Sequence, residues 1–285
     1  MKKMSFSEEL QFAKKHGYAV GAFNIFSYLS AVAVVHAANE LDVPVILQTS
    51  ASTVKKFGPS ELGGMLRQIA QNAPVNVLIH LDHCREVELA KACIEAGWNS
   101  VMFDGSRLEI EENIALCQEV ADYAHSRGVD VEGELGIIAG VEDDFSVEED
   151  DASATEVEEA VRFVRDSGID ALAPAIGTAH GVYKGVPKIN FRLMEELRDS
   201  LAVPIVVHGG TGLSEDTFRK LIGLGAAKIN VSTAIKHAYM DSSREYLKKN
   251  PDGLDPLEYD AYMHDSIRDT ARRHLQIFCG NRRAD

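Results

Sequence analysis

The chain has 285 residues, of which 45% are apolar and 26% charged, a composition typical of a globular protein with a full hydrophobic core. Its formal charge of −15 argues against nucleic acid or an anionic membrane surface as a partner, because either requires a basic face. No run approaches the roughly 18 apolar residues of a membrane span, and MKKMSFSEEL lacks the apolar core of a signal peptide, so we expect a cytoplasmic protein.

The cysteines have neither CxxC spacing nor a short secreted chain around them, which makes a disulfide framework or a thiolate zinc knuckle improbable. We therefore expect four free thiols, at Cys84, Cys93, Cys117 and Cys279.

Strand-like apolar runs alternate with helix-period segments along the whole chain. The predicted strands are 19–24, 44–50, 76–83, 100–105, 130–136, 171–178, 204–209 and 228–232. Amphipathic helices lie between them, for example 109–126 and 154–167, and most end at a glycine suited to a left-handed cap. This alternation predicts an α/β fold with parallel strands closed into a (β/α)8 TIM barrel, the competitor being a doubly wound open sheet. We expect one domain spanning 1–285.

After the eighth strand, the pattern predicts a helix over 233–249, a PDGLDP turn, and a final amphipathic helix over about 257–279. The turn could link a separate unit, but roughly 25 residues cannot form their own core. We therefore expect a C-terminal helical extension, about 255–279, packed on the barrel or on a neighbouring subunit. Two long connections interrupt the regular rhythm, an acidic one over 136–154 and a glycine-rich one over 179–188, and long loops in compact barrels are usually functional or disordered.

The stretch VLIHLDHC packs His80, Asp82 and His83 into the end of a buried strand. Side chains of a regular strand alternate faces, which would point His80 and Asp82 one way and His83 the other. A bend at the strand's end would instead bring Asp82 and His83 to one site.

Barrel enzymes place their active residues at the carboxyl ends of strands. Polar residues at those ends are Asn24, Ser50, Asp82, His83, Glu134, His180, His208, Asn230, Ser232 and Thr233. Three histidines from three strands predict a catalytic zinc site with an open position for water or substrate. Alternatively, each histidine only hydrogen-bonds a loop. Lys228 begins the eighth strand and is expected to face the bottom of the barrel, away from this rim.

Glycines follow two of these histidines, and successive glycine amides can form a nest that binds an anion. The residues suited to a phosphate are Gly181, Lys184, Gly209, Gly210, Thr211, Ser232 and Thr233. Alternatively, the glycines of HGGTGLS only make a tight turn before the helix at Ser214.

In order along the chain, HLDHC, EGELGIIAGVEDD, AIGTAHGVYKG, HGGTGL and KINVSTAI resemble the class II, zinc-dependent ketose-bisphosphate aldolases, which cleave fructose or tagatose 1,6-bisphosphate. The resemblance implies that His83, His180 and His208 bind zinc, with Glu134 as a nearby or alternative ligand. It also implies that Asp82 handles the C4 hydroxyl proton and that Glu142 exchanges the proton on the carbon that becomes nucleophilic.

Further implied roles concern the substrate. The residues implied to hold the phosphate of dihydroxyacetone phosphate are Gly181, Lys184, Gly209, Thr211, Asn230, Ser232 and Thr233, while Asn24 and Ser50 would contact the sugar chain. A monovalent cation, Na⁺ or K⁺, often binds near Gly181 and Gly209 in this family.

The substrate's distal end is the least determined part of the resemblance. Relatives use a basic residue of the final helix, supplied by a neighbouring subunit, and this chain has His264 and Arg268 near that position. If His264 takes that role, the distal group carries less charge than a phosphate, as in a ketose 1-phosphate. The resemblance also implies a homodimer or homotetramer.

Two other functions compete with the aldolase. A zinc hydrolase would usually show a His-x-His pair on the first strand, where this chain has Phe23 and Asn24. A noncatalytic partner subunit of an active aldolase would be expected to lose zinc ligands, and all three histidines are present here.

Overall fold

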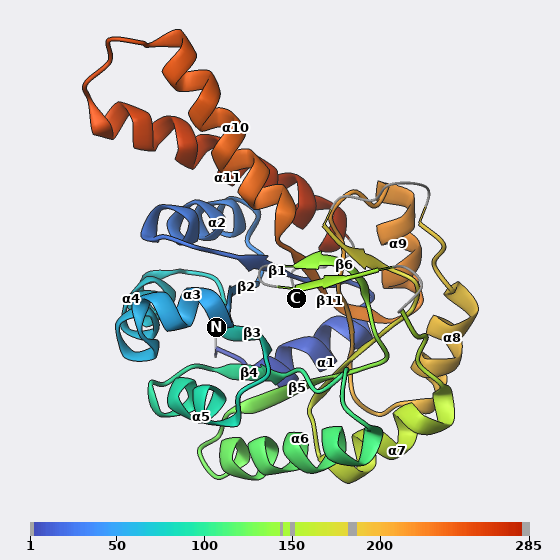
Figure 1. Cartoon of the computed structure of the whole chain (residues 1–285). Helices are drawn as coiled ribbons and strands as arrows, with labels where there is room; N and C mark the ends of the chain where they lie inside the picture. The colour runs from blue at the N-terminus through green and yellow to red at the C-terminus, as the bar shows by residue number, and fades with distance from the viewer. Residues whose placement is uncertain (1–2, 143–144, 149–151, 182–186, 281–285) are drawn as a thin grey trace.

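The computed structural model describes residues 3–142, 145–148, 152–181 and 187–280. Eight parallel strands close into a barrel in the order β1-β11-β10-β8-β5-β4-β3-β2, which confirms the predicted TIM barrel and excludes the open sheet (Figure 1). Its strands are β1 (Val20–Asn24), β2 (Val45–Ser50), β3 (Val77–Cys84), β4 (Ser100–Phe103), β5 (Asp130–Leu135), β8 (Ala171–Pro174), β10 (Ile205–Val207) and β11 (Ala226–Val231).

Most of these strands are close to their predicted bounds because each is an apolar run that the barrel buries on both faces. The sixth barrel strand is shorter than predicted: β8 stops at Pro174, and Gly177 then turns with φ +88°. His180 consequently lies beyond the barrel strand, in a segment with different hydrogen-bond partners.

Helices surround the barrel and end where the sequence indicates. They are α1 (Phe6–His16), α2 (Tyr28–Leu41), α3 (Ala51–Phe57), α4 (Pro59–Asn72), α5 (Val87–Glu95), α6 (Ile110–His125), α7 (Val157–Ser167), α8 (Phe191–Ser200), α9 (Glu215–Gly223), α10 (Thr233–Lys249) and α11 (Pro256–Phe278). Gly168 caps α7 with φ +70°, the left-handed conformation predicted for it. Among the described helices, none has both the length and the apolar character needed to cross a membrane.

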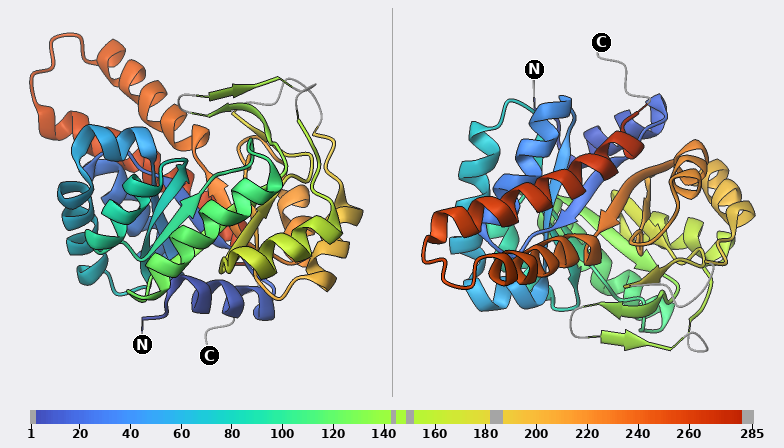
Figure 2. Two further views of the ribbon diagram at one scale, coloured as in Figure 1. Left: turned by 60° about the horizontal axis from the view of Figure 1, so that its bottom comes forward. Right: turned by 90° about the horizontal axis from the view of Figure 1, so that it is seen from above.

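Helix α1 covers the amino-terminal end of the barrel, and no strand pattern in the sequence indicates this position. A capping box between Ser5 and Glu8 fixes its start. Phe6, fully buried, stacks on the His80 ring with centroids 5.1 Å apart. Figure 2 shows α1 and the β6–β7 hairpin at opposite ends of the molecule, so α1 lies far from the rim that carries the site.

The acidic connection predicted as a loop is partly a small sheet. Strands β6 (Ala139–Glu142) and β7 (Phe145–Val147) form an antiparallel hairpin, and β6 also pairs in parallel with β9 (Ala179–His180). The sequence pattern predicts only a long acidic connection over 136–154 and misses these strands, because the pairing partner β9 lies some 40 residues away and local pattern cannot reveal it. Gly140, with φ +109°, lets β6 approach the backbone of His180 too closely for a Cβ.

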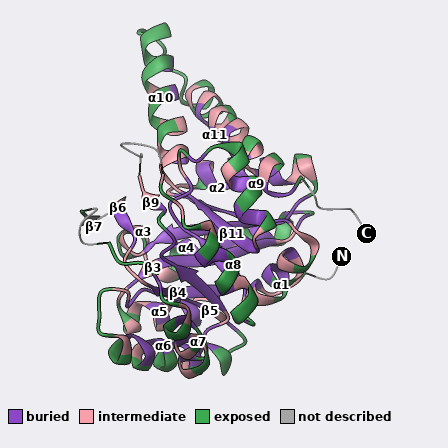
Figure 3. Cartoon of the chain, turned by 90° about the vertical axis from the view of Figure 1, so that its right-hand side faces the viewer, coloured by how far each residue is buried: buried purple, intermediate pink, exposed green. Residues whose placement is uncertain are grey.

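The two C-terminal helices form a hairpin that projects from the barrel (Figure 1). Helix α10 has its predicted bounds, and α11 packs along α2 and against α9 and α10. The expected extension thus packs on the barrel within its own chain. In Figure 3 the barrel strands are buried at the centre while the far end of the α10–α11 hairpin is exposed.

Candidate active site

The end of β3 bends, which brings Asp82 and His83 to one site. The pairing between β3 and β4 shifts register between Leu81 and Cys84, and His83 adopts φ +47°. An extra residue in one strand is a β-bulge, which redirects a side chain and is common beside active sites. Of the two alternatives for VLIHLDHC, the structure has the bend: His80 and Asp82 both lie inside the barrel, and His83 also turns toward the other histidines.

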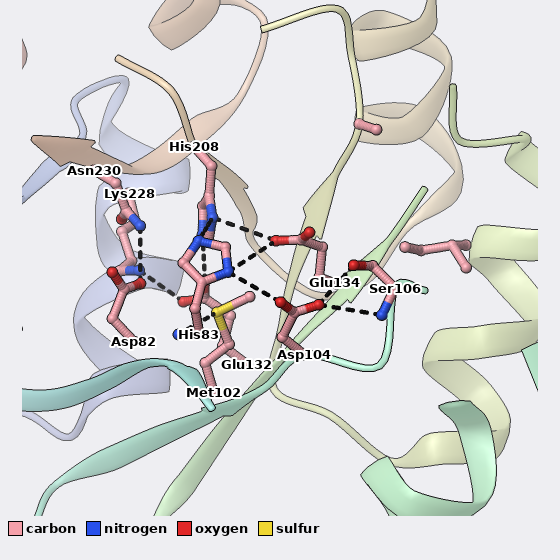
Figure 4. Close-up of polar contacts among 12 residues, drawn as sticks. Asp82, His83, Met102, Asp104, Ser106, Glu132, Glu134, His208, Lys228 and Asn230 are labelled. Carbon is pink, nitrogen blue, oxygen red and sulfur yellow. Dashed lines mark hydrogen bonds and ion pairs between the residues drawn. The ribbon is translucent and has the colours of Figure 1, made fainter. Parts of the chain in front are cut away.

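Three histidines meet at this rim. The Nε2 atom of His83 lies 2.9 Å from Nδ1 of His208, and the ring centroids of His83 and His180 are 5.0 Å apart. Ligand atoms of all three rings lie within 4.8 Å of one another, so they could hold one metal ion. Glu134 lies beside them, its Oε2 3.4 Å from His208 Nδ1 and 3.7 Å from His83 Nδ1 (Figure 4).

Two of these rings contact a carboxylate through the nitrogen that faces away from the other histidines. His208 Nε2 is 2.8 Å from Oε1 of Glu132, and His83 Nδ1 is 3.3 Å from Oδ2 of Asp104. A metal-binding histidine commonly donates its second N–H to a carboxylate, which fixes the tautomer and the orientation of the ring. Each ring thus presents its other nitrogen to the cluster. The residues present fit a divalent metal with nitrogen ligands better than they fit histidines that only hydrogen-bond a loop.

The electrostatics of the site suit metal binding. Burial lowers the pKa of His208 despite the hydrogen bond to Glu132, which favours the neutral imidazole that binds metals. Burial alone would raise the pKa of Asp104, but hydrogen bonds from His83 and Ser106 and the charge of Arg85 outweigh it and lower that pKa well below its ordinary value. Asp104 is therefore an ionised acceptor behind His83.

A buried ion pair supports His208 from inside the barrel. Lys228 Nζ lies 2.8 Å from Oε2 of Glu132, and both side chains are fully buried. The expectation that Lys228 faces the bottom, away from the rim, is corrected here: its buried ammonium group contacts Glu132, which also contacts His208 (Figure 4). Burial alone would raise the pKa of Glu132, but Lys228 and the histidines lower it.

Asp82 is held by three amide side chains. Its Oδ2 accepts from Nδ2 of Asn24 at 2.8 Å and from Nε2 of Gln48 at 3.2 Å, and its Oδ1 accepts from Nδ2 of Asn230 at 3.2 Å. The carboxylate is 1% exposed, so these donors fix its orientation next to the histidine cluster.

Beside His180 lies a polar pocket. It is lined by His180, Gly181, Gly209, Gly210, Thr211, Asn230, Ser232, Thr233 and Lys236. Gly209 has φ +70°, and a Cβ there would lie 2.4 Å from the Ala179 carbonyl oxygen, so only glycine fits. Apart from Lys184, the residues expected to hold a phosphate lie around this one pocket. Ala234 N donates to Thr211 Oγ1 at 3.4 Å and so links two of its walls.

Other predicted site residues lie elsewhere or outside the described part. Ser50 Oγ lies within hydrogen-bond distance of Ser52 and Thr53 at the start of α3. Lys184 lies outside the described residues, and of Glu142 only the backbone is described, as the end of β6. The structure does not bring the two residues of the final helix to the cluster in their own chain.

Those two residues, His264 and Arg268, are on α11 where it packs along α2. His264 Nε2 lies 2.9 Å from Nδ1 of His36, and Arg268 forms ion pairs with Glu40 and Asp265.

Several site residues are not among those named from sequence. Asp104 directly follows an apolar strand in VMFDG, and Glu132 stands two residues before Glu134, so strand periodicity would have pointed to both. Gln48 likewise stands two residues before Ser50, whereas Lys236 carries no local signal beyond its place in the first turn of α10. All four cysteines are free, as predicted, and the structure shows that all four are buried.

Comparison with known proteins gives one family. The family model for class II fructose-bisphosphate aldolase matches residues 4–283. The YdjI aldolase of Escherichia coli K12 is 31% identical, with 98% of each chain covered and a TM-score of 0.85. A Coccidioides immitis protein assigned as a fructose-1,6-bisphosphate aldolase is 25% identical, with 99% of this chain and 98% of that chain covered and a TM-score of 0.88.

The fructose-bisphosphate aldolase of Campylobacter jejuni is 23% identical over 96% of this chain and 95% of that one, with a TM-score of 0.82, and shows the shared fold alone. The family match spans the bulged β3 end, the histidine cluster and the glycine pocket together. The chain belongs to the class II fructose-bisphosphate aldolase family.

Proposed function

We propose that the protein is a zinc-dependent aldolase that reversibly cleaves a ketose 1,6-bisphosphate, of the fructose or tagatose type, to dihydroxyacetone phosphate and an aldehyde such as glyceraldehyde 3-phosphate. One observation carries the proposal: His180 belongs both to the three-histidine cluster and to the lining of the polar pocket. A metal ion held by the cluster and a phosphate in the pocket would therefore be neighbours, as the two ends of a small phosphorylated ketone require.

The chemistry divides between the metal and the chain. Zinc, when bound by His83, His180 and His208 with Glu134 nearby, is a Lewis acid that stabilises negative charge developing on substrate oxygens. Asp82 removes the proton of the C4 hydroxyl in cleavage and returns it in condensation. Its fixed orientation supports this role, because Asn24, Gln48 and Asn230 donate to both of its oxygens.

Other residues position the substrate. In this proposal the residues that bind the phosphate of dihydroxyacetone phosphate are Gly181, Lys184, Gly209, Gly210, Thr211, Asn230, Ser232 and Thr233. Glu142 exchanges the proton at the reacting carbon, Asn24 and Ser50 contact the sugar chain, and a monovalent cation binds near Gly181 and Gly209.

The distal end of the substrate is assigned to a second subunit. The hairpin exposes large apolar side chains, Met240, Leu247, Leu254 and Leu257, which suits contact with another copy of the chain. A homodimer or homotetramer in the cytoplasm is proposed, with His264 or Arg268 facing a neighbour's site. If His264 fills that role, the substrate is a ketose 1-phosphate.

The test measures metal content and dihydroxyacetone phosphate release together. Fructose 1,6-bisphosphate, tagatose 1,6-bisphosphate and a ketose 1-phosphate are compared with and without chelator. Cleavage that chelator abolishes and zinc restores supports the proposal, and the preferred substrate identifies the distal group. His180→Ala should lose both zinc and cleavage, whereas His16→Ala, at the end of α1, should lose neither.

Bound zinc without cleavage of any of the three would favour the noncatalytic partner. Chelator-resistant cleavage would contradict the metal-dependent mechanism.

A further inference from the structure

The phosphate pocket contains a lysine that the sequence pattern does not single out. Its described lining consists of glycine backbone, hydroxyls, the Asn230 amide, His180 and Lys236. Of these described lining residues, Lys236 is the lysine, whose side chain ends in a compact ammonium group. A phosphate monoester carries nearly two negative charges near neutral pH, and the chain as a whole has a formal charge of −15. Binding it therefore requires positive charge inside the pocket itself.

Helix geometry directs Lys236 toward the same point as the other donors. Helix α10 begins at Thr233, directly after Ser232, and Lys236 is three residues beyond the first and four beyond the second. Residues three and four apart share a face of a helix. Long helical side chains lean back toward the N-terminus, so the Lys236 ammonium reaches toward the first turn of α10.

The same place offers the other features of an anion site. The first turn of α10 brings the positive end of the helix dipole, worth about half an elementary charge, to this pocket. The Thr211 hydroxyl accepts from Ala234 N and so ties the glycine loop after β10 to this turn. Lys236 is half-buried, which strengthens its interaction with an anion relative to that of an exposed lysine.

We propose that Lys236 is the lysine of α10 that pairs with the substrate phosphate and gives the pocket its preference for phosphorylated ketoses. This rests on the proposed function, which assigns the phosphate to this pocket. The phosphate takes no part in bond cleavage, so Lys236 contributes equally to binding substrate and transition state. Its loss raises KM and leaves kcat nearly unchanged.

The experiment compares Lys236→Met, Lys236→Arg and Lys248→Met in the full-length, zinc-loaded protein. Met keeps the aliphatic stem, and Lys248 is an exposed lysine near the far end of the same helix. Calorimetry measures the affinity for inorganic phosphate and for dihydroxyacetone phosphate. Lys236→Met should bind both about 10- to 100-fold more weakly, Lys236→Arg should retain most of the affinity, and Lys248→Met should match the wild type.

Each result bears on Lys236 separately from the aldolase reaction. Phosphate affinity unchanged in Lys236→Met would overturn the proposal and leave Lys184, already assigned to this phosphate, as the lysine that binds it. A wild-type protein that binds neither ligand would overturn it too. Phosphate binding that depends on Lys236, in a protein that cleaves none of the three ketoses, would support the role of Lys236. It would contradict the substrates proposed for the aldolase reaction instead.

Discussion

Replacing Asp82 with Asn tests the proposed proton transfer while keeping the shape of the side chain. The wild-type carboxylate accepts from Asn24, Gln48 and Asn230. In Asp82→Asn, the amide oxygen can keep the first two bonds, while the new NH2 group would face the Nδ2 of Asn230. The Oδ1 atom of Asn230 is buried without a hydrogen-bond partner among the described residues, so a flip of the Asn230 amide lets this oxygen accept from the new NH2 group.

The structure therefore predicts a folded variant that binds metal. Losing the charge from three hydrogen bonds should cost about 1–3 kcal/mol of folding stability. Losing the acid–base group should reduce kcat by about 10²–10⁴, or about 3–5 kcal/mol of barrier. Comparing the loss of folding stability with the loss of kcat distinguishes a catalytic role from a structural one. If Asp82 were purely structural, kcat would fall only as far as the fraction of folded protein falls.

The assay measures zinc content, thermal unfolding and steady-state cleavage on the same preparations. Asp130→Asn is the matched control, since Asp130 accepts from Ser7 N at 2.8 Å at the opposite end of the barrel. That control should keep wild-type kcat. Turnover within tenfold of wild type in fully metallated Asp82→Asn would refute the assigned role.

Three further predictions concern the support of the site. Glu132→Gln leaves the buried Lys228 ammonium without its partner and should lower the free energy of unfolding of the metal-free protein in urea by about 3–5 kcal/mol. Adding Lys228→Met should recover most of this loss. A single and a double variant of equal stability would contradict the buried pair. The pKa of Glu132 is lower in the folded protein than its unfolded value of 4.5. The stability that its carboxylate contributes is therefore complete above pH 4.5 and is lost as the pH falls through the folded-state pKa. Metal-free wild type should consequently lose stability on acidification more steeply than the double variant. All four thiols are buried, and burial raises the pKa of Cys84 to about 11. Ellman's reagent at pH 8 should therefore find no reactive thiol in the native protein and all four after unfolding, and rapid labelling of the native protein would contradict this burial.

The sequence by itself determined the order of elements and the rim on which the chemistry lies. Apolar runs alternating with amphipathic helices give parallel strands, and parallel strands place all their carboxyl ends at one edge. His83, His180 and His208 could therefore be grouped without coordinates. The lengths of α10 and α11 followed from local periodicity and caps, which depend on neighbouring residues alone.

Only the tertiary structure decided how these groups face one another. The bulge that turns His83 arises from the register shift between β3 and β4, and the Glu132–Lys228 pair joins residues 96 positions apart. Helix α1 beneath His80 and the pairing of β6 with β9 are likewise contacts between distant segments. Local sequence indicates which side chains a strand buries, but closure of the barrel sets the distances between those side chains. Metal binding, proton transfer and phosphate recognition depend on these distances.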